Sequence, residues 1–522
     1  MVETARMPTA YEDQSEVFSF LDNPSTFGSC VEVRRIDTHG AVVFLAGADA
    51  YKIKRAVRFP FMDFSTLEKR RIACEAEIAV NKPNAPEIYL GVVPIVRTLR
   101  DGLALGGAGE IVEWAVHMRR FNEEATLDRF VERDALRPEL LIRLVEAILR
   151  SHDRAPRRDG GRAFDALARY LDQNETAFAA TPALFDPARA ELLGKDARAA
   201  LAATKPLLLA RGAAGYVRRC HGDLHLRNIA LINGEPTLFD AVEFDDDIAT
   251  GDVLYDLAFL LMDLEERRLR PAANLLLNRY LWRSEQAHLA GLAALPIFLS
   301  IRSAIRAKVV AAGLQHLQGE VRKRAETEAR RYFWFAEEFL KPQGARLVAV
   351  GGLSGTGKSA LSSRIAPLLG RAPGAVWLRS DIERKRLFGV AETAGLPQDA
   401  YSKTAAQEVY ALLGRKAALA LKAGQSVIVD AVHSKPHERA GIASVAAELG
   451  VPFIGLWLEA PLATRLARVA SRTRDASDAN AAIAAAQTDD NARSPAWRSI
   501  DASGDIDAVV QAALRSLGTL AQ

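Results

Sequence analysis

The stretch HGDLHLRN occupies residues 221–228, and the stretch LFDAVEF follows at 238–244. Between them, two short apolar runs flank an Asn-Gly pair, which adopts positive φ angles at low cost and therefore favours a β-hairpin turn. A hairpin with arms of similar length would bring Asn228 and Asp240, the residues just outside it, close together. An amide oxygen beside a carboxylate suits Mg²⁺, so the sequence predicts a magnesium site at the open end of the hairpin.

Asp223 lies one short loop before this hairpin, and the loop would turn its carboxylate toward Asn228 and Asp240. A carboxylate in that place can orient or deprotonate a hydroxyl group that attacks a phosphorus atom. The three residues together therefore indicate a magnesium-dependent phosphoryl-transfer site.

The composition limits the class of protein. A chain of 522 residues exceeds one comfortable core, so we expect two or three domains. The formal net charge of +3 is too small to indicate nucleic-acid or membrane binding by itself. The three cysteines form no CxxC pair, which argues against a disulfide framework or a zinc site and favours a reducing compartment. The N-terminus is polar, unlike a signal peptide, and the most apolar runs are short, so we expect a cytoplasmic protein with no membrane-spanning helix.

The pattern of the sequence changes once along the chain. Short strand-like and helix-like segments alternate at first, and the sequence is nearly all helical from 253 to about 340. The polar stretch KPQGAR at 341–346 contains Pro and Gly and is the best candidate linker. Strand, glycine loop and helix then alternate through the end, which is typical of an α/β unit. We therefore expect one domain over 1–340 and a second over 345–522.

HGDLHLRN resembles the catalytic loop of the aminoglycoside phosphotransferase and choline kinase group, a branch of the protein-kinase-like fold. The match extends to LFDAVEF, where Asp240 stands at the position of the metal-binding Asp, and to YDLAFL at 255–260. In that group a helix after the metal loop carries an Asp that braces the catalytic loop, and Asp256 matches it. The resemblance covers roughly residues 30–340 and implies an α+β domain with two lobes.

This resemblance assigns roles to the predicted site residues. Asp223 would act as base or orienter for the acceptor hydroxyl, and Asn228 and Asp240 would hold Mg²⁺ against the ATP phosphates. A lysine on a strand, paired with a glutamate on a helix, would grip the α- and β-phosphates.

Two lysines and two glutamates compete for that last pair. In DAYKIKR, Lys52 and Lys54 lie on one face of a strand. We favour Lys52, because Ala50 would then lie on the same face under the adenine, and Lys54 is the alternative. For the partner we favour Glu77 over Glu75.

One feature departs from the kinase pattern. The segment RIDTHGAVVFLAG before the lysine strand contains no G-x-G-x-x-G motif to cover the phosphates, which leaves open whether this lobe turns over ATP or only binds it. The acidic run EFDDD at 243–247 could bind a cationic substrate, although a solvated loop is the simpler interpretation. We interpret His221 and His225 as structural, because Asp223 already occupies the position of the base.

GGLSGTGKS occupies residues 351–359 and contains the pattern G-x-x-x-x-G-K-S. It follows an apolar strand and opens a helix, which is the context that a phosphate-binding P-loop needs. Glycines let backbone N–H groups surround phosphates at a helix N-terminus. Lys358 would reach the β- and γ-phosphates, and Ser359 would bind Mg²⁺. The predicted nucleotide-binding residues are Gly352, Gly355, Thr356, Gly357, Lys358 and Ser359.

Two further motifs belong with this P-loop. The strand SVIVD ends at Asp430, where a Walker B carboxylate would face the bound Mg²⁺. LRSDIERKRLFG at 378–389 resembles the second-strand motif of P-loop small-molecule kinases, the group with gluconate kinase-like, zeta-toxin-like and polynucleotide 5′-kinase-like domains. The resemblance implies that Asp381 contacts the phosphate acceptor and serves as base, while Arg384 helps to hold the acceptor. A helix N-cap is the alternative role for Asp381.

The stretch APLATRLARVASRTRDASDA at 460–479 resembles the lid of the same group. Arginines that close over a transferring phosphoryl group neutralise the charge that spreads over its oxygens. Arg472 is our first choice for this catalytic role and Arg468 our second, and an exposed arginine-rich helix face is the alternative. His433 and His437, after the Walker B strand, are further candidates for substrate contact.

Together the motifs predict a bifunctional phosphotransferase that uses ATP and Mg²⁺ and modifies an alcohol group of a small molecule in each half. One alternative is that the N-terminal half is a nucleotide- or metabolite-binding regulator and only the P-loop half catalyses. A further alternative makes the P-loop half a nucleic-acid 5′-kinase, although the near-neutral charge argues against a nucleic-acid partner. The identity of the acceptors, the coupling of the two reactions and the oligomeric state do not follow from the sequence.

Overall fold

The structure is a computed structural model. It describes residues 12–28, 32–59, 62–98, 102–284, 286–470, 485, 487 and 497–518. By its contacts the chain divides into two compact units: unit 1 comprises 1–167 and 209–260, and unit 2 comprises 168–208 and 261–522. The division does not coincide with the candidate linker at 341–346, because the helices after residue 261 group with the C-terminal sheet. The domain boundary at the linker therefore stays a prediction.

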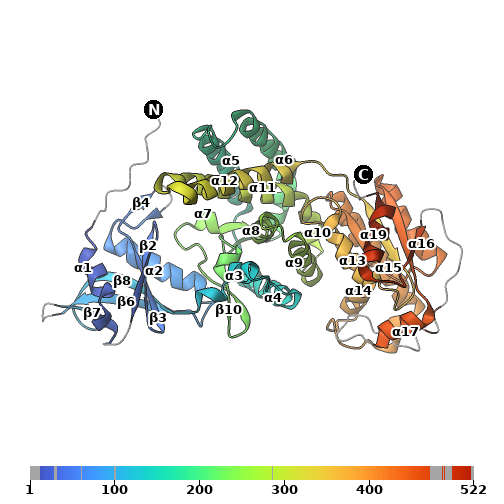
Figure 1. Ribbon diagram of the computed structural model, residues 1–522, viewed down its shortest axis with the longest axis horizontal. Helices are drawn as coiled ribbons and strands as arrows, with labels where there is room; N and C mark the ends of the chain where they lie inside the picture. The colour runs from blue at the N-terminus through green and yellow to red at the C-terminus, as the bar shows by residue number, and fades with distance from the viewer. Residues whose placement is uncertain are drawn as a thin grey trace. The chain divides into compact units, whose positions relative to one another are not determined.

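Unit 1 contains a six-stranded antiparallel sheet with the strand order β1-β2-β3-β8-β6-β7 (Figure 1). The strands are β1 (Val33–Asp37), β2 (Ala41–Ala46), β3 (Asp49–Lys54), β6 (Tyr89–Arg97), β7 (Leu103–Leu105) and β8 (Glu110–Arg119). Alternate residues of the central strands, such as Phe44 and Ile53, enter one apolar cluster with helix α1 (Ser15–Asp22). Helix α2 (Leu67–Asn81) begins at its N-cap Thr66 and packs on β8, where Cys74 and Val116 share a second cluster.

The predicted hairpin is confirmed. Strand β10 (Ile229–Ile232) pairs antiparallel with β11 (Glu235–Leu238). The turn residues Asn233 and Gly234 have φ angles of 51° and 84°, and two consecutive positive values are what a type I′ turn requires. Phe239 N–H donates to Asn228 O over 3.0 Å and extends the ladder by one step. The hairpin therefore holds the residues before and after it at fixed positions.

The remaining elements of unit 1 include helices and short strands. They are β4 (Arg58–Phe59), β5 (Met62–Asp63), α3 (Leu127–Glu132), α4 (Pro138–Arg154), β9 (Val217–Arg219), α7 (Asp246–Ala249) and β12 (Thr250–Asp252). Three helices contain the boundaries between the units, namely α5 (Gly160–Ala179), α6 (Pro187–Ala213) and α8 (Val253–Glu266).

Unit 2 contains a five-stranded parallel sheet with the order β14-β15-β13-β16-β17, as the sequence predicted for an α/β P-loop domain. The strands are β13 (Leu347–Gly351), β14 (Val376–Arg379), β15 (Val427–Asp430), β16 (Phe453–Glu459) and β17 (Trp497–Asp501). Every residue of β13, β14 and β15 is buried, which is typical of a parallel sheet covered on both faces. The chain order reverses beside β13, and ligands of such sheets bind at the carboxyl ends of the strands at this switch point.

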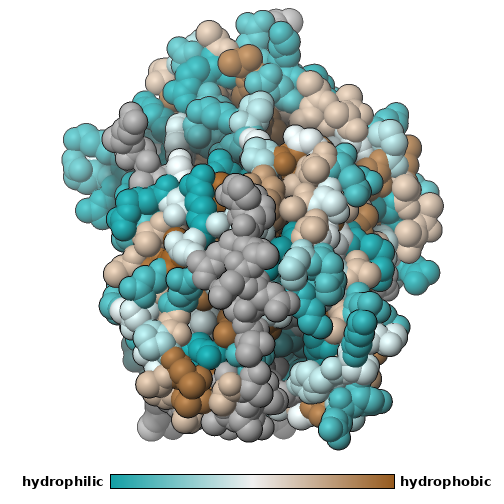
Figure 2. All heavy atoms as spheres, turned by 90° about the vertical axis from the view of Figure 1, so that its right-hand side faces the viewer, coloured by the Kyte–Doolittle hydropathy of each residue, from teal (hydrophilic) through white to brown (hydrophobic). Residues whose placement is uncertain are grey.

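Helices connect the strands of this sheet. They are α13 (Lys358–Ile365), α14 (Ser380–Leu387), α15 (Lys403–Lys422), α16 (Pro436–Leu449), α17 (Leu462–Ala470) and α19 (Ile506–Leu517). Helix α13 packs with α19, and α15 packs with α16. The face shown in Figure 2 carries hydrophilic side chains over much of its area, with apolar ones in small scattered groups.

The helices between residues 270 and 340 also belong to unit 2. They are α9 (Arg270–Arg283), α10 (Ala287–Gly291), α11 (Leu295–Gly313) and α12 (Gly319–Leu340). Ser300 Oγ and Ser303 Oγ on α11 donate to backbone carbonyls of α12 over 2.8 and 2.7 Å. The stretch 287–316 is apolar and long enough to be a candidate membrane span, but 78% of its most apolar window is buried inside the fold. Such burial is what the core helix of a water-soluble fold shows, so the candidate is weak.

Helix α9 completes the edge of the parallel sheet. Asn274 Nδ2 and Asn278 Nδ2 donate to Ala375 O over 3.0 and 3.1 Å. Trp377 N–H donates to Asn278 Oδ1 over 2.7 Å, and Trp282 Nε1 donates to Trp377 O over 2.8 Å. The α9 side chains therefore bond the backbone at edge strand β14, as a neighbouring strand would.

Candidate active sites

Lys52 on β3 joins the sheet of unit 1 to the hairpin region. Its ammonium nitrogen lies 2.8 Å from Glu77 Oε1 on α2 and 2.9 Å from Asp240 Oδ1 after β11. Glu77 is fully buried, and burial alone would raise the pKa of its carboxyl. The adjacent ammonium groups of Lys52 and Lys54 outweigh that cost and hold the pKa of Glu77 below its ordinary value, so the carboxylate is charged.

Lys54 occupies a different place on the same face of β3. Its ammonium group contacts Glu77 and Glu243, and its side chain is 2% exposed, compared with 17% for Lys52. Glu75 pairs instead with Arg71 at the surface of α2 over 2.6 Å. The geometry therefore sets Lys52 and Glu77 beside the hairpin residue Asp240, and sets Lys54 in a buried ion-pair network.

Asn228 and Asp223 contact each other, and Asp240 contacts Lys52. Asn228 Nδ2 donates to Asp223 Oδ2 over 2.9 Å and to Asp223 O over 3.0 Å. Because these bonds use the amide nitrogen, the amide oxygen is the atom with which Asn228 can bind a cation. The side chains of Asp223 and Asp240 are 39% and 47% exposed, so a ligand can reach both. One amide oxygen and a carboxylate form a donor set that fits Mg²⁺.

Buried residues hold the Asp223 loop in shape. Asp256 Oδ1 accepts the Gly222 N–H over 2.8 Å, and its other oxygen lies 3.2 Å from His152 Nε2. His221 Nε2 donates to Phe239 O over 2.9 Å, and burial lowers the pKa of this imidazole, which keeps it neutral. Asp256 and His221 thus occupy the places of a loop brace and a structural histidine.

Sequence reasoning missed two residues that position the Asp240 backbone. Tyr89 on β6 accepts the Asp240 N–H at its hydroxyl oxygen over 3.1 Å. Asn81 on α2 accepts the Ala241 N–H over 2.7 Å and donates to Ala241 O over 3.3 Å. Asn81 stands one helical turn after Glu77, so the helix spacing was a signal for it; Tyr89 carried no local signal.

The acidic residues of the run at 243–247 form ion pairs or hydrogen bonds within unit 1. They pair as follows: Glu243 with Lys54, Asp245 with the α7 backbone, Asp246 with Arg219, and Asp247 with Arg162. These contacts favour a structural interpretation over a site for a cationic substrate.

The glycines of the P-loop adopt conformations that other residues rarely reach. Gly352, Gly355 and Gly357 have φ angles of 142°, 86° and 94°. A Cβ at Gly352 would lie 2.7 Å from Thr356 Oγ1 and 2.8 Å from the carbonyl oxygen of Leu458, so the backbone needs glycine there. The loop follows β13 and ends where α13 begins, as the motif requires.

Ser359 and Asp430 meet beside this loop. Ser359 Oγ donates to Asp430 Oδ2 over 2.7 Å, because Asp430 ends β15, which pairs in parallel with β13. Burial raises the pKa of Asp430, and Arg379 and Lys358 oppose that effect. Lys358 Nζ donates to Leu353 O over 3.3 Å. A serine hydroxyl and a buried carboxylate in contact are the pair that Mg²⁺ uses in P-loop sites.

Two residues of β14 also reach this point and were not predicted. Trp377 Nε1 donates to Asp430 Oδ2 over 3.3 Å. Arg379 Nη2 lies 3.5 Å from Ser359 Oγ, and its Nε lies 4.0 Å from Asp430 Oδ2. No motif in the sequence indicated this role for Arg379, since it faces Asp430 only through the parallel register of β14 and β15.

Asp381 lies in the first turn of α14, whose N-cap is Arg379 with no side-chain cap bond. The structure therefore does not place Asp381 at the N-cap. The negative charge of Asp381 raises the pKa of Asp430 further, which indicates that the two carboxyl groups are neighbours. Arg384 Nη1 donates to Ala400 O over 2.7 Å, and its guanidinium lies 5.3 Å from the Tyr401 ring centre.

Arg472, the first choice for the lid arginine, lies outside the described residues. Arg468 on α17 donates to Ala502 O over 2.7 Å and to Gly504 O over 3.2 Å. Its Nη1 also lies 3.5 Å from Thr356 O. Arg468 therefore links α17 to the phosphate loop.

Comparison with known proteins agrees with this geometry. Residues 71–295 match the family model described as "Phosphotransferase enzyme family", and residues 347–493 match the one described as "AAA domain". Uncharacterized protein Rv2004c of Mycobacterium tuberculosis is 32% identical over 487 residues, which cover 89% of this chain and 93% of that protein. A protein of Mycobacterium bovis matches equally well.

The chain belongs to the same family as these mycobacterial proteins. It is a fusion of an aminoglycoside phosphotransferase- and choline kinase-like region with a P-loop small-molecule kinase-like region. The predicted fold classes are confirmed: an α+β kinase-like region comes first, and a P-loop domain with a parallel sheet follows. The two matches support phosphotransferase activity and nucleotide binding in general terms.

Two solved structures show partial similarity to this chain. A gluconokinase from Sinorhizobium meliloti 1021 is 20% identical with a TM-score of 0.26, and the match covers 35% of this chain and 95% of that one. A choline/ethanolamine kinase family protein from Mesorhizobium loti is 14% identical with a TM-score of 0.36, and the match covers 63% of this chain and 95% of that one.

Proposed function

We propose that this protein is a bifunctional, Mg²⁺- and ATP-dependent phosphotransferase, in which each half transfers the γ-phosphoryl group of ATP to an alcohol group of a small molecule. The proposal is carried by the contact between Lys52 and Asp240, which stand 188 positions apart in the sequence. A lysine and an aspartate that meet in this way fit a nucleotide site in which the lysine binds phosphates and the aspartate binds Mg²⁺. The P-loop supplies the second nucleotide site.

In unit 1 the roles follow from position. Lys52, held by Glu77, would bind the α- and β-phosphates, and Asn228 and Asp240 would hold Mg²⁺. The bound ion would neutralise charge on the phosphate oxygens. Asp223 would accept the proton of the acceptor hydroxyl, and the Asn228 amide would keep its carboxylate oriented.

In the P-loop domain the backbone of residues 352–359 would surround the phosphates, with Lys358 on the β- and γ-phosphates. Ser359 and Asp430 would hold Mg²⁺ there. Asp381 would take the proton of the second acceptor, and Arg384 and Arg472 would bind the acceptor and the moving phosphoryl group.

The cellular setting is part of the proposal. Cys74 and Cys220 are buried free thiols, which fits a reducing compartment such as the cytoplasm. We propose small-molecule substrates, with neither membrane nor nucleic acid as a partner.

Labelled ATP with a metabolite extract tests the proposal. Asp223→Ala should slow the formation of one set of labelled products by about 10²–10⁴-fold, which removes them from a short assay. Lys358→Ala should remove another set. The double variant should remove both. If Asp223→Ala loses no product, unit 1 is a nucleotide- or metabolite-binding regulator and only the P-loop half catalyses.

A further inference from the structure

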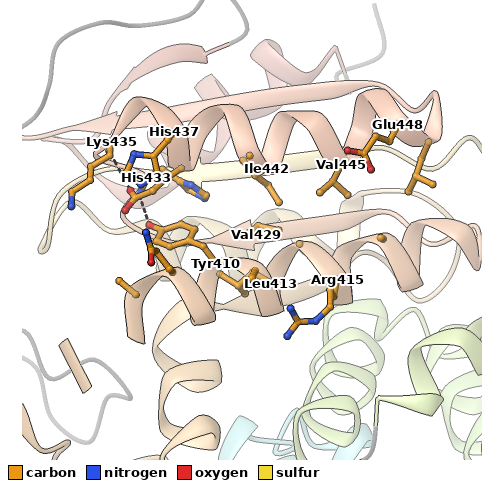
Figure 3. Close-up of a pocket in the computed structure, with 18 of the residues that line it drawn as sticks. Tyr410, Leu413, Arg415, Val429, His433, Lys435, His437, Ile442, Val445 and Glu448 are labelled. Carbon is orange, nitrogen blue, oxygen red and sulfur yellow. Dashed lines mark hydrogen bonds between the residues drawn. The ribbon is translucent and has the colours of Figure 1, made fainter. Parts of the chain in front are cut away.

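A cavity of about 480 Å³ lies between α15 and α16 in unit 2 (Figure 3). Its walls are largely apolar: Leu413 comes from α15, Val429 from β15, and Ile442 and Val445 from α16. Polar and charged residues of both signs also line it. Glu438 is half-buried and accepts a hydrogen bond from the Tyr410 hydroxyl, and the others are exposed: Lys403, Gln407, Arg415, Lys422, Lys435, His437 and Glu448. A cavity of this size and lining is typical of sites for small molecules.

His433 forms the polar end of the cavity. The residue is fully buried, and among the described residues neither ring nitrogen makes a hydrogen bond of good geometry, although the Val429 backbone offers the ring one hydrogen-bonding group. Its backbone N–H donates to the Tyr410 hydroxyl oxygen over 2.9 Å, and its ring packs between those of Tyr410 and Trp497. Buried polar atoms are rarely left unpaired, because each costs stability. At least one ring nitrogen is therefore left without a partner, which indicates a place for a ligand atom.

The imidazole of His433 is uncharged. Burial, reinforced by the positive charge of Lys358, lowers its pKa to about 3. A neutral imidazole offers one donor and one acceptor, and a hydroxyl group can serve either. The polar end of the cavity therefore suits an uncharged hydroxyl group.

This polar end adjoins the P-loop site. The N–H of Gly352, in the P-loop, donates to the carbonyl oxygen of Val432, the residue before His433, over 3.1 Å. His433 also follows Asp430, the last residue of β15, by only three positions. A molecule bound along the cavity would thus have its polar end close to the transferring phosphoryl group.

We propose that this cavity binds the acceptor of the P-loop half, and that the acceptor is an alcohol with an apolar chain. This inference rests on the proposed function of that half. The apolar chain lies between α15 and α16, and a hydroxyl group beside the reacting one bonds His433. The reacting hydroxyl oxygen forms a bond to the γ-phosphorus, the bond from that phosphorus to the β,γ-bridging oxygen breaks, ADP leaves, and the hydroxyl proton passes to Asp381.

A series of straight-chain 1,2-diols, from butane-1,2-diol to octane-1,2-diol, tests the inference. Binding to the full chain is measured by calorimetry with Mg²⁺ and a non-hydrolysable ATP analogue, and transfer is measured with labelled ATP. Each added methylene should tighten binding about fourfold. Erythritol and xylitol, which have no apolar chain, should bind no more tightly than butane-1,2-diol.

Two variants separate the walls from the polar end. Val445→Trp fills the cavity and should abolish the dependence on chain length, whereas Val309→Trp, at an exposed position on α11, should leave it intact. His433→Asn tolerates the φ angle of 50° but shortens the reach, so it should weaken every diol about tenfold and preserve the chain-length slope.

Two results overturn the inference. One is a dissociation constant that does not change with the chain length of the diol. The other is a dissociation constant that decreases with chain length as steeply in Val445→Trp as in the unmodified chain. The slope in the unmodified chain decides the matter even if Val445→Trp fails to fold. The proposed function survives that result if Lys358→Ala still removes labelled products from the metabolite extract. If Lys358→Ala removes none, the proposed function of the P-loop half fails, and the assignment of the cavity to its acceptor fails with it.

Discussion

Lys52 and Lys54 stand two residues apart on β3, and their neighbours differ. Lys52 contacts Asp240, whereas Lys54 contacts Glu243, and both contact Glu77. The local sequence places both side chains on one face but does not distinguish them, because the distinction comes from a loop that lies almost 190 positions later. Two lysines of equal charge can therefore have separate tasks.

Substitution should separate these tasks. Lys54→Met leaves Glu243 buried without its cation and should lower the free energy of unfolding by about 3–5 kcal/mol. Lys52→Met should cost less stability, because Glu77 keeps Lys54, but should weaken nucleotide binding at least tenfold. Urea unfolding and ATP-analogue binding, both in a Lys358→Ala background, measure the two effects. Equal losses of stability and affinity in both variants would contradict the assignment.

Glu265 on α8 should make the free energy of unfolding depend on pH. Burial raises the pKa of this carboxyl from 4.5 to about 7, and Arg270 opposes the effect. Because the folded pKa lies above the ordinary value, protonated Glu265 favours folding, and this stability is lost as pH rises from 4.5 through 7. The loss should be at most about 3 kcal/mol.

Glu265→Gln should remove that loss. The free energy of unfolding is measured in urea at pH 5 and pH 8. The difference between the variant and the unmodified chain should shift in favour of the variant at pH 8. Glu320→Gln, at an exposed position on α12, is the control and should run parallel to the unmodified chain. Parallel curves for Glu265→Gln as well would show that Glu265 titrates normally.

At the scale of elements, the hairpin β10–β11 and the P-loop were predictable because each is set by a few adjacent residues. Asn233-Gly234 determines a turn, and the glycines at 352, 355 and 357 determine a phosphate loop. The contact of α9 with β14 was not predictable, since it joins a helix to a strand about 100 positions later in the sequence. Arg379 and Trp377 were missed for the same reason, because only strand register brings them to Asp430.

The α9 contact predicts a stability effect that reaches the P-loop domain. Asn278→Ala leaves the buried Trp377 N–H without an acceptor and should destabilise unit 2 by about 1–3 kcal/mol. Gln315→Ala, which removes an exposed amide from the same unit, should change little. Urea unfolding followed by tryptophan fluorescence measures both. An unchanged midpoint for Asn278→Ala would mean that water replaces the bond and that α9 does not support β14.

At the scale of the whole molecule, we propose that one chain carries two nucleotide sites. The sequence predicted both, because each depends on short motifs whose residues carry a specific chemistry. It did not predict the acceptors, because the walls of a pocket such as the one between α15 and α16 come from helix faces that carry no motif. Arg472 stays a prediction, since it lies outside the described residues.

The central claim is most directly tested by the number of Mg²⁺-dependent sites for a non-hydrolysable ATP analogue, counted by calorimetry on the intact chain. We expect two sites per chain. Lys358→Ala should leave one and Lys52→Met should leave the other, so the double variant should bind none. A single site that survives Lys52→Met unchanged would contradict the account.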